Sequence, residues 1–475
     1  MRIPVALVAL LLCDCAHRVE CSTHGGPVWH ELRTQHFMML TDLPIAQARA
    51  EALDLEELRI AIRWFYQLTP DGDDFTDVLF LRDEDELLEF VDLGGFANTT
   101  DPPEAGLLVS TWAPAKSWRR SRVIPHELAH RFSSDAFPPS SGWLEEGTAA
   151  YLETIKLKGP WAAKLGGMGD YFGFDGRPLS LEELWAIPWF GALTGAARSA
   201  AYASAWAYVH YLTNHEPEKW AQFLARRRIE RDAQLAFEAI FTAELRPAIE
   251  KAVTDYKDAA RFRSQNVDMT YDRRILSEAE LPPWRVHLLR RLLEQTGSGN
   301  EQQKAARVAA EKELARSLAP TPLPWLVEEA LADGDKKALR AAALAHPEEY
   351  QAHDAHANEA LLLEDFPAAL NSANAALALR PAGPSALRIL GLAQLRTNDV
   401  AAAASNLERA QRMAPWSVHF ALGMAQLVSA QGKCAELSSW IARVKLIGTD
   451  KANFWDTYEK EATVYCAAQA KALAP

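Results

Sequence analysis

The chain has 475 residues, which is too long for one compact core, so we expect two or three domains. Hydrophobic residues make up 49% and charged residues 24% of the sequence, an ordinary balance for a globular protein. The formal net charge of -13, with no long run of lysine or arginine, argues against a protein that binds a phosphate backbone, so no nucleic-acid partner is expected.

The N-terminus has the pattern of a signal peptide, which we assign to residues 1–22. One arginine precedes an apolar run over residues 3–12, and this run is too short to span a bilayer. A leucine lies three residues before Cys15, which resembles a bacterial lipoprotein signal, although Asp14 stands where a small residue is usual. We expect export to the periplasm, the outer membrane or the extracellular space, and membrane attachment through a lipidated Cys15 stays open. Two further cysteines compete for that role and fit it no better: Cys13 and Cys21.

The first hundred residues are predicted to form a mixed α/β region. An extended segment over residues 29–43 precedes a helix over residues 46–68, whose apolar positions recur at helical spacing. Two short strands follow, at residues 77–81 and 105–112, and between them lies a helix at residues 83–91 that begins with acidic residues. A sheet therefore precedes the helical part of the chain, and we expect its strand near residues 107–111 to pair with an extended peptide.

Beyond Arg120 the sequence predicts helices almost throughout. Ser180 and Glu183 have the spacing of a capping box, with leucines placed for a hydrophobic staple. The glycine- and aromatic-rich segment before them, residues 164–178, is either the rim or lid of a cleft or a plain surface connection. A further helix is expected over residues 199–212.

The C-terminal third contains an internal repeat. Small residues recur every 34 positions where the two helices of one unit would touch, and prolines mark the same period: Pro347, Pro381 and Pro415, then Ala357, Gly391 and Ala425, then Ala369 and Ala403, then Ala376 and Ala410. In the third unit Leu437 and Val444 replace the expected alanines. The pattern resembles tetratricopeptide repeats, and the resemblance implies a surface that binds a peptide or a protein partner. We assign residues 347–475 to a repeat domain with a capping helix near its end, and residues 266–346 to an irregular helical connector.

Two cysteines, Cys434 and Cys466, belong to this repeat domain. We favour the interpretation that each is a small buried residue of a helical array. A disulfide between them is the alternative in an oxidising compartment.

Residues 122–132, RVIPHELAHRF, contain two histidines four apart with a glutamate beside the first. On a helix His126 and His130 point the same way from adjacent turns, so both imidazoles can reach one zinc-sized ion. Glu127 lies about 100° round the helix axis. From there its carboxylate can reach a water beside the metal, as a general base must. Pro125 indicates that the helix begins within a turn of it, and the alternative is a helix that carries two solvated or core histidines.

A zinc site that stays open to water needs a third protein ligand. The metzincin spacing fails, because Ser133 and Ala136 occupy its glycine and ligand positions. After a break at residues 140–142 a second helix is expected, and its first turn carries Glu145 and Glu146. If this helix folds back against the first, a carboxylate from it can face the two histidines.

HELAH followed by WLEEGTAAYLE resembles the gluzincin group of zinc peptidases, the peptidase MA-like clan. The resemblance implies an α+β peptidase domain over residues 23–265, although its specific part is limited to residues 126–153. It implies a zinc ion held by His126, His130 and Glu146, with Glu145 as the rival third ligand and Glu127 as the general base. Many members carry a tyrosine or histidine that bonds the developing oxyanion. Tyr202 is the first candidate here, followed by Tyr208 and His210, and for each the alternative is ordinary packing in the core.

The sequence therefore predicts an exported zinc metallopeptidase of the α+β class fused to an all-α repeat domain. The exopeptidase signature of the aminopeptidases, Gly-x-Met-Glu-Asn, is absent, which favours an endopeptidase acting on a peptide or protein substrate. The alternative is a catalytically weak or inactive zinc-binding scaffold that acts through its repeats. A purely structural repeat protein, without zinc, is the third candidate.

Overall fold

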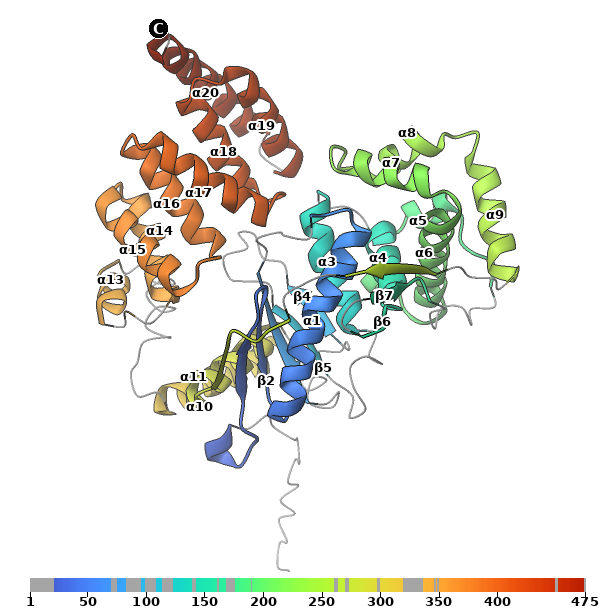
Figure 1. Cartoon of the computed structure of the whole chain (residues 1–475), viewed down its shortest axis with the longest axis horizontal. Helices are drawn as coiled ribbons and strands as arrows, with labels where there is room; N and C mark the ends of the chain where they lie inside the picture. The colour runs from blue at the N-terminus through green and yellow to red at the C-terminus, as the bar shows by residue number, and fades with distance from the viewer. Residues whose placement is uncertain are drawn as a thin grey trace, which may run out of the picture.

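A computed structural model shows an α+β chain, with a small N-terminal sheet among helices and a helical C-terminal region (Figure 1). It describes residues 21–69, 75–82, 95–98, 108–112, 123–138, 142–159, 162–167, 176–188, 190–259, 264–269, 273–296, 300–318, 336–345, 347, 350–448 and 452–473. The expected signal peptide lies outside this part of the chain up to residue 20, together with Cys13 and Cys15. The helix expected at residues 83–91 and the middle of the glycine-rich segment also lie outside it.

The N-terminal sheet has six strands, whose bounds are β1 His30–Arg33, β2 Phe37–Thr41, β3 Thr76–Leu81, β4 Gly95–Asn98, β5 Leu108–Trp112 and β9 Ser277–Glu280. They stand in the order β4-β5-β3-β2-β1-β9. β2, β3 and β5 run parallel, whereas β4 is antiparallel to β5, and β1 is antiparallel to both β2 and β9. The extended segment expected over residues 29–43 is thus a hairpin of two strands.

The strand expected to pair with a peptide is not at the edge of the sheet. β5 lies between β3 and β4, so both of its sides are paired, and the expectation for residues 107–111 is wrong. Among the described strands, the edge at this end is β4, which the sequence did not predict. β4 contacts helix α3 (Val123–Ala136), so an edge strand runs beside the helix that carries the histidine pair.

Both faces of the sheet are covered. Along β3, Val78 and Phe80 pack into a cluster with helix α1 (Ile45–Phe65), whereas Leu79 and Leu81 pack on the other side with residues of helix α10 (Pro283–Thr296). This division follows from the two-residue period of a strand. Helix α11 (Glu301–Leu318) packs on α10. Residues 266–346, expected to be a connector, therefore supply β9, α10 and α11 to the sheet domain.

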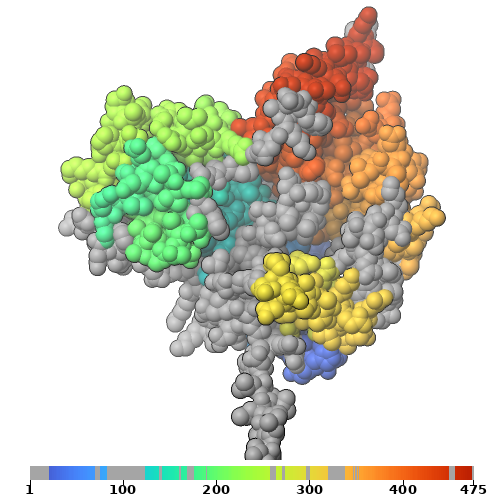
Figure 2. Space-filling view, turned by 180° about the vertical axis from the view of Figure 1, so that it is seen from behind, coloured from blue at the N-terminus to red at the C-terminus, as the bar shows by residue number. Residues whose placement is uncertain are grey.

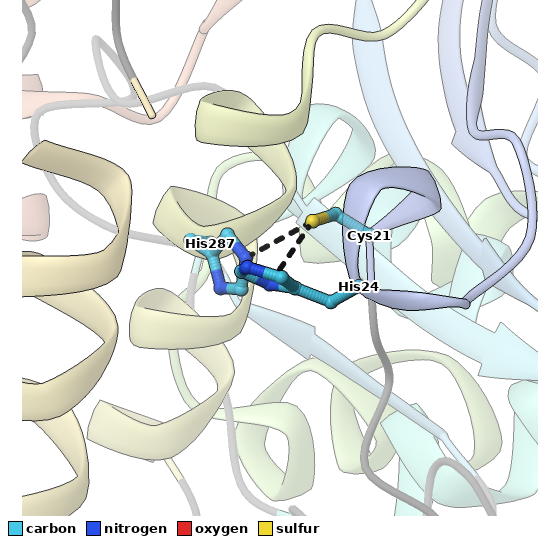
Figure 3. Close-up of side chains that lie close together, drawn as sticks. All are labelled: Cys21, His24 and His287. Atoms are coloured by element: carbon cyan, nitrogen blue, oxygen red, sulfur yellow. Dashed lines mark hydrogen bonds between the residues drawn. The ribbon is translucent and has the colours of Figure 1, made fainter. Parts of the chain in front are cut away.

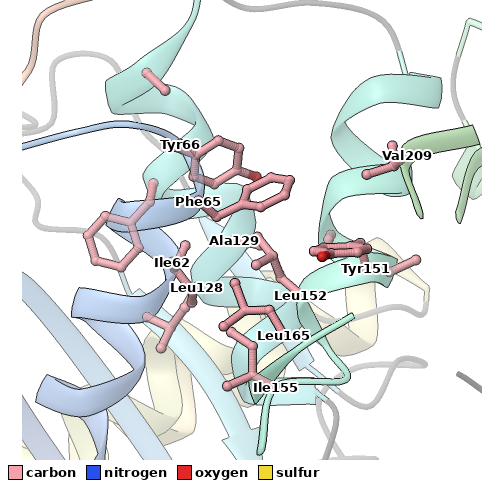
Figure 4. Close-up of a cluster of buried hydrophobic side chains, with 14 of the residues drawn as sticks. Ile62, Phe65, Tyr66, Leu128, Ala129, Tyr151, Leu152, Ile155, Leu165 and Val209 are labelled. Carbon is pink, nitrogen blue, oxygen red and sulfur yellow. The ribbon is translucent and has the colours of Figure 1, made fainter. Parts of the chain in front are cut away.

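The main core lies where the end of α1 meets α3, helix α4 (Gly142–Leu152), strand β7 (Ala162–Leu165) and helix α6 (Gly195–His215) (Figure 4). Phe65 at the end of α1 stacks on Tyr151 of α4 with ring centroids 5.2 Å apart. The Tyr66 hydroxyl donates to the Thr148 hydroxyl at 3.0 Å, inside the same core. These contacts join α1 to the second helix of the histidine motif.

Short elements complete this domain. β7 pairs with β6 (Lys156–Leu157) and β8 (Gln265–Asp268). The capping box is confirmed: Ser180 accepts from Glu183 N–H and the Glu183 carboxylate accepts from Ser180 N–H, at the start of helix α5. The remaining bounds are η1 Ser22–His24, α5 Leu181–Trp185, η5 Phe190–Ala192, α7 Pro217–Arg227, α8 Ala233–Phe241 and α9 Arg246–Ala259.

The C-terminal region is a stack of helix pairs with the 34-residue period. After α13 (Lys336–Ala345), the helices are α14 Tyr350–Leu362, α15 Phe366–Leu379, α16 Pro384–Arg396, α17 Val400–Met413, α18 Val418–Ala430, α19 Cys434–Ile447 and α20 Ala452–Leu473. The residue that turns each pair is left-handed and recurs on the same period, at Glu364, Asn398 and Gly432. A side chain at Gly391 would meet Leu407 Cγ at 2.6 Å, which explains why this position must be small.

Cys434 and Cys466 form a disulfide that joins α19 to α20, with Cα atoms 5.7 Å apart. The favoured interpretation of two unpaired buried cysteines is therefore wrong, and the alternative holds. Packing of α20 against α18 and α19 brings the two positions together, although 32 positions separate them in sequence.

The repeat region touches the sheet domain through Arg380. Its guanidinium lies 3.2 Å from the Asp77 carboxylate on β3 and stacks 4.6 Å from the ring of Phe75. Seen from behind, α10 and α11 (yellow) lie below the helices of the repeat region (orange) (Figure 2). None of the helices in the described part of the chain combines the length and the hydropathy that a membrane span requires.

Candidate metal centre

Helix α3 presents its histidines on the side away from the core. Ile124, Leu128 and Phe132 are fully buried on the inner side of the helix, whereas the side chains of His126 and His130 keep 15% and 22% of their exposure. The helix begins two residues before Pro125, within the turn that the sequence predicted. The apolar stripe of α3 therefore fixes the direction in which both imidazoles point.

Helix α4 packs closely against α6 because of Gly147. A Cβ atom at this position would lie 2.8 Å from the carbonyl oxygen of Ala205 and 3.0 Å from Val209 Cγ2, both on α6. Trp143 on the same helix is buried against Phe223 of α7 and Phe237 of α8. This packing holds Glu146, one residue before the glycine, at a fixed height against α3.

Glu146, and not Glu145, lies with the histidines. The Glu146 Oε2 atom is 3.4 Å from His126 Nε2 and 3.6 Å from His130 Nε2, and the two Nε2 atoms are 3.2 Å apart. Glu145 points elsewhere, since its charge acts on Tyr66 and Arg227. The sequence-based choice of Glu146 over its neighbour thus agrees with the position of both side chains.

These three donor atoms fit a tetrahedral zinc ion. Ligand bonds of about 2.1 Å at tetrahedral angles require donor atoms about 3.4 Å apart, and the observed separations of 3.2, 3.4 and 3.6 Å bracket that value. Glu146 Oε2 is buried, makes no hydrogen bond of regular geometry with the described residues, and has the two imidazoles as its ion-pair neighbours. A buried carboxylate of this kind is costly unless a positive charge lies beside it, either a proton on these rings or a metal cation between them.

Glu153 supports His126 from behind. Its Oε2 atom lies 3.3 Å from His126 Nδ1, the ring nitrogen on the far side from the other ligands. A carboxylate in this position fixes the tautomer and the orientation of a metal-binding imidazole. Glu153 is not among the site residues expected from the sequence, although it follows Glu146 by seven residues, which is two helical turns and therefore the same face.

The electrostatics of the site favour a positive charge at His126. Burial lowers the pKa of His126, but the carboxylates of Glu146, Glu153 and Glu127 outweigh it and raise that pKa to about 10. Burial raises the pKa of Glu146, whereas both histidines lower it well below its usual range. Surroundings that stabilise a proton on this cluster also stabilise a metal cation between the same donors.

Of the three oxyanion candidates, only Tyr202 lies at the site. Its ring centroid is 6.4 Å from that of His126, and Phe190 packs edge-on against it at 5.3 Å. Tyr208 is buried on the same helix, where burial raises its pKa and its charged neighbours are Glu250, Glu183 and Arg177. Tyr208 therefore does not fit the role.

His210 is also wrong as an oxyanion candidate, because both its ring nitrogens are used elsewhere. Nε2 donates to the Gly166 carbonyl at 3.0 Å, and Nδ1 accepts from the Tyr256 hydroxyl at 2.9 Å. Burial lowers the pKa of this imidazole to about 4, so the ring is neutral. His210 ties the end of β7 to α6 and α9.

No protein-family model and no curated protein sequence matches this chain.

Proposed function

We propose that the protein is a zinc-dependent peptidase of the gluzincin type, and specifically an endopeptidase. The observation that supports this most is the triangle of His126, His130 and Glu146, whose donor separations suit zinc. Glu127 follows His126 on the same helix, and its charge already acts on that imidazole. Partial exposure of the ligands leaves a side from which water and a substrate can approach.

In this proposal each residue has one task. Bound zinc supplies a Lewis acid that polarises the substrate carbonyl and lowers the pKa of a water toward neutral. The Glu127 carboxylate accepts the proton of the attacking water and then delivers it to the leaving amine. The Tyr202 hydroxyl donates a hydrogen bond to the oxygen that becomes negative, and Glu153 keeps the imidazole of His126 in place.

The edge of the sheet suggests how a substrate binds. β4 is the last described strand at its end of the sheet and contacts α3. An extended peptide that added to β4 as another strand would pass beside the histidine pair. Strand addition accepts the middle of a chain as readily as its end, which supports an endopeptidase.

For the C-terminal region we propose tetratricopeptide repeats that hold a protein partner or the substrate. The support is the recurrence of helix starts at Tyr350, Pro384 and Val418, each 34 residues apart. Asp365 and Asp399 cap the second helices on the same period. Stacked helix pairs of this kind present extended surfaces to peptides.

We also propose that the protein is exported. The disulfide between Cys434 and Cys466 supports this proposal, because structural disulfides persist in oxidising compartments. Acylation of Cys15 would add a membrane anchor.

The test is zinc analysis combined with proteolysis of an unfolded protein pool. Wild type is expected to bind zinc at His126, His130 and Glu146. Glu146→Ala should lose this zinc, whereas Glu145→Ala, the same change one residue away, should keep it. Glu127→Ala should keep zinc and lose about 10²–10⁴-fold in cleavage rate.

The outcomes separate the candidate functions. Zinc that depends on Glu146, without cleavage that depends on Glu127, would favour the zinc-binding scaffold that acts through its repeats. If Glu145→Ala and Glu146→Ala retain the same zinc content, the proposed centre is refuted.

A further inference from the structure

A second group of side chains that could hold a metal ion consists of Cys21, His24 and His287 (Figure 3). Cys21 belongs to the cluster on the face of the sheet opposite α1. Cys21 and His24 come from the first described turn of the chain, and His287 comes from α10. Cys21 Sγ is 3.5 Å from His24 Nδ1 and 3.4 Å from His287 Nε2. Positions 21 and 287 are 266 residues apart, so only the tertiary fold brings them together.

The neighbours of His287 orient its imidazole as a metal ligand is oriented. Its other nitrogen, Nδ1, lies 2.7 Å from Glu311 Oε2 on α11. Glu311 is in turn held by Arg290, whose Nε is 3.2 Å from Oε1. A carboxylate on the far nitrogen directs Nε2 toward the sulfur and raises its basicity, as it does behind metal-binding histidines.

The Cys21 sulfur atom is held in a fixed, buried position. Cys21 is fully buried in the cluster between the sheet and α10, and the Thr23 hydroxyl lies 3.0 Å from Sγ. His24 is exposed and closes the group from the solvent side. The group therefore consists of a buried sulfur, a buried imidazole and one exposed imidazole.

The distances match a thiolate–imidazole zinc site. With zinc–sulfur bonds of about 2.3 Å and zinc–nitrogen bonds of about 2.1 Å, tetrahedral angles place sulfur and nitrogen about 3.6 Å apart. The observed values are 3.4 and 3.5 Å. A sulfur–imidazole hydrogen bond explains one such distance, but two histidines that converge on one sulfur, with a carboxylate behind one of them, are the donor set of a metal site.

We propose that Cys21, His24 and His287 bind a second zinc ion, with Glu311 as the positioning residue. This site is independent of the proposed peptidase centre. It fastens the beginning of the described chain to α10, and so closes a loop of more than 260 residues around the sheet. The site requires that Cys21 stays in the mature chain with a free thiol. Any signal-peptide cleavage must then occur before residue 21, earlier than the boundary expected at residue 22, and Cys21 is not the lipidated cysteine.

Cobalt substitution tests the site separately from the first centre. Cobalt bound to a thiolate shows a strong sulfur-to-metal absorption in the near ultraviolet, and a centre of two histidines and a carboxylate has no sulfur ligand. We expect this band in the full chain and its loss in Cys21→Ser. It should persist in the variant with Cys13 and Cys15 changed to serine, and in Glu146→Ala.

Affinity and mass measurements complete the test. Glu311→Gln should retain the band but weaken zinc binding about 10- to 100-fold in a chelator competition. Absence of the band from the folded wild type, or its survival in Cys21→Ser, would overturn the proposal. A lipid on Cys21 in the intact mass would overturn it too. If Cys21→Ser fails to fold, protection of Cys21 from alkylation by added zinc in wild type decides, and a thiol that reacts equally with and without zinc refutes the site.

Discussion

The contact between α4 and α6 allows a sharp test of how the proposed centre of His126, His130 and Glu146 is held. In Gly147→Ala the new Cβ atom would lie 2.8 Å from the carbonyl oxygen of Ala205. Because this neighbour is backbone, the two helices must separate by roughly 0.5 Å to restore ordinary contact. Overpacking of this kind lowers the free energy of unfolding by about 1–3 kcal/mol. Alanine in place of glycine inside a helix raises it by about 1 kcal/mol.

The free energy of unfolding should therefore fall only modestly, by about 0–2 kcal/mol. Zinc affinity should fall more clearly, on the order of tenfold, because a shift of α4 changes the position of Glu146 relative to the histidines on α3. Urea denaturation measures the first quantity, and competition with a chromophoric chelator measures the second.

Gly423→Ala in α18 is the matched control. Its new Cβ would meet only a methyl group of Leu407, at 3.2 Å, and a side chain can yield. This control should be neutral or slightly stabilising, with unchanged zinc affinity. If Gly147→Ala gains stability like the control and binds zinc as tightly as wild type, the close approach of α4 and α6 does not position Glu146.

Three further predictions concern residues outside the direct ligands. Glu153→Gln should weaken zinc binding about 10- to 100-fold in the chelator competition while the fold persists, and an unchanged affinity would show that Glu153 does not orient His126. Replacing both cysteines of the Cys434–Cys466 disulfide by serine removes the closure of a loop with a sequence separation of 32. It should lower the local stability of α19 and α20 by about 4 kcal/mol. Hydrogen exchange of their amides measures this loss, and unaltered exchange would contradict it. Burial depresses the folded pKa of His210 to about 4, below its unfolded value near 6.5. Neutral His210 therefore contributes stability that is complete above pH 6.5 and lost as the pH falls through 4, about 3 kcal/mol in all. Urea titrations between pH 7 and 4 should show a shallower loss in His210→Asn than in wild type, and parallel curves would refute this account.

Local patterns predicted the elements that carry the candidate site. The apolar stripe of α3 and the small residues of the repeats can be recognised in short stretches of sequence, because helix periodicity depends on neighbours three and four residues apart. The capping box at Ser180 is local in the same sense. The spacing of His126 and His130 on one helix is enough to align their rings.

Local sequence patterns could not predict which strands pair when they lie far apart in the chain. β9 joins the sheet beside β1 about 250 residues from its partner strand, and no local pattern marks it. Residues 277–280 are exposed throughout and carry none of the alternation that would show a strand. The edge position of β4 depends likewise on which strands pair, and strand order is a property of the assembled sheet.

The sequence by itself determined which side chains can act as ligands and bases: two imidazoles on one helical face, a carboxylate pair on the next helix, and small residues on a 34-residue period. Only the tertiary structure decided which carboxylate meets the imidazoles, that Glu153 lies behind His126, and that Cys21 meets His287. The reason is physical. Helical spacing is set by hydrogen bonds between near neighbours in the sequence. The approach of α4 to α6 and of the N-terminal turn to α10 is set by side-chain packing between segments that lie far apart in the sequence.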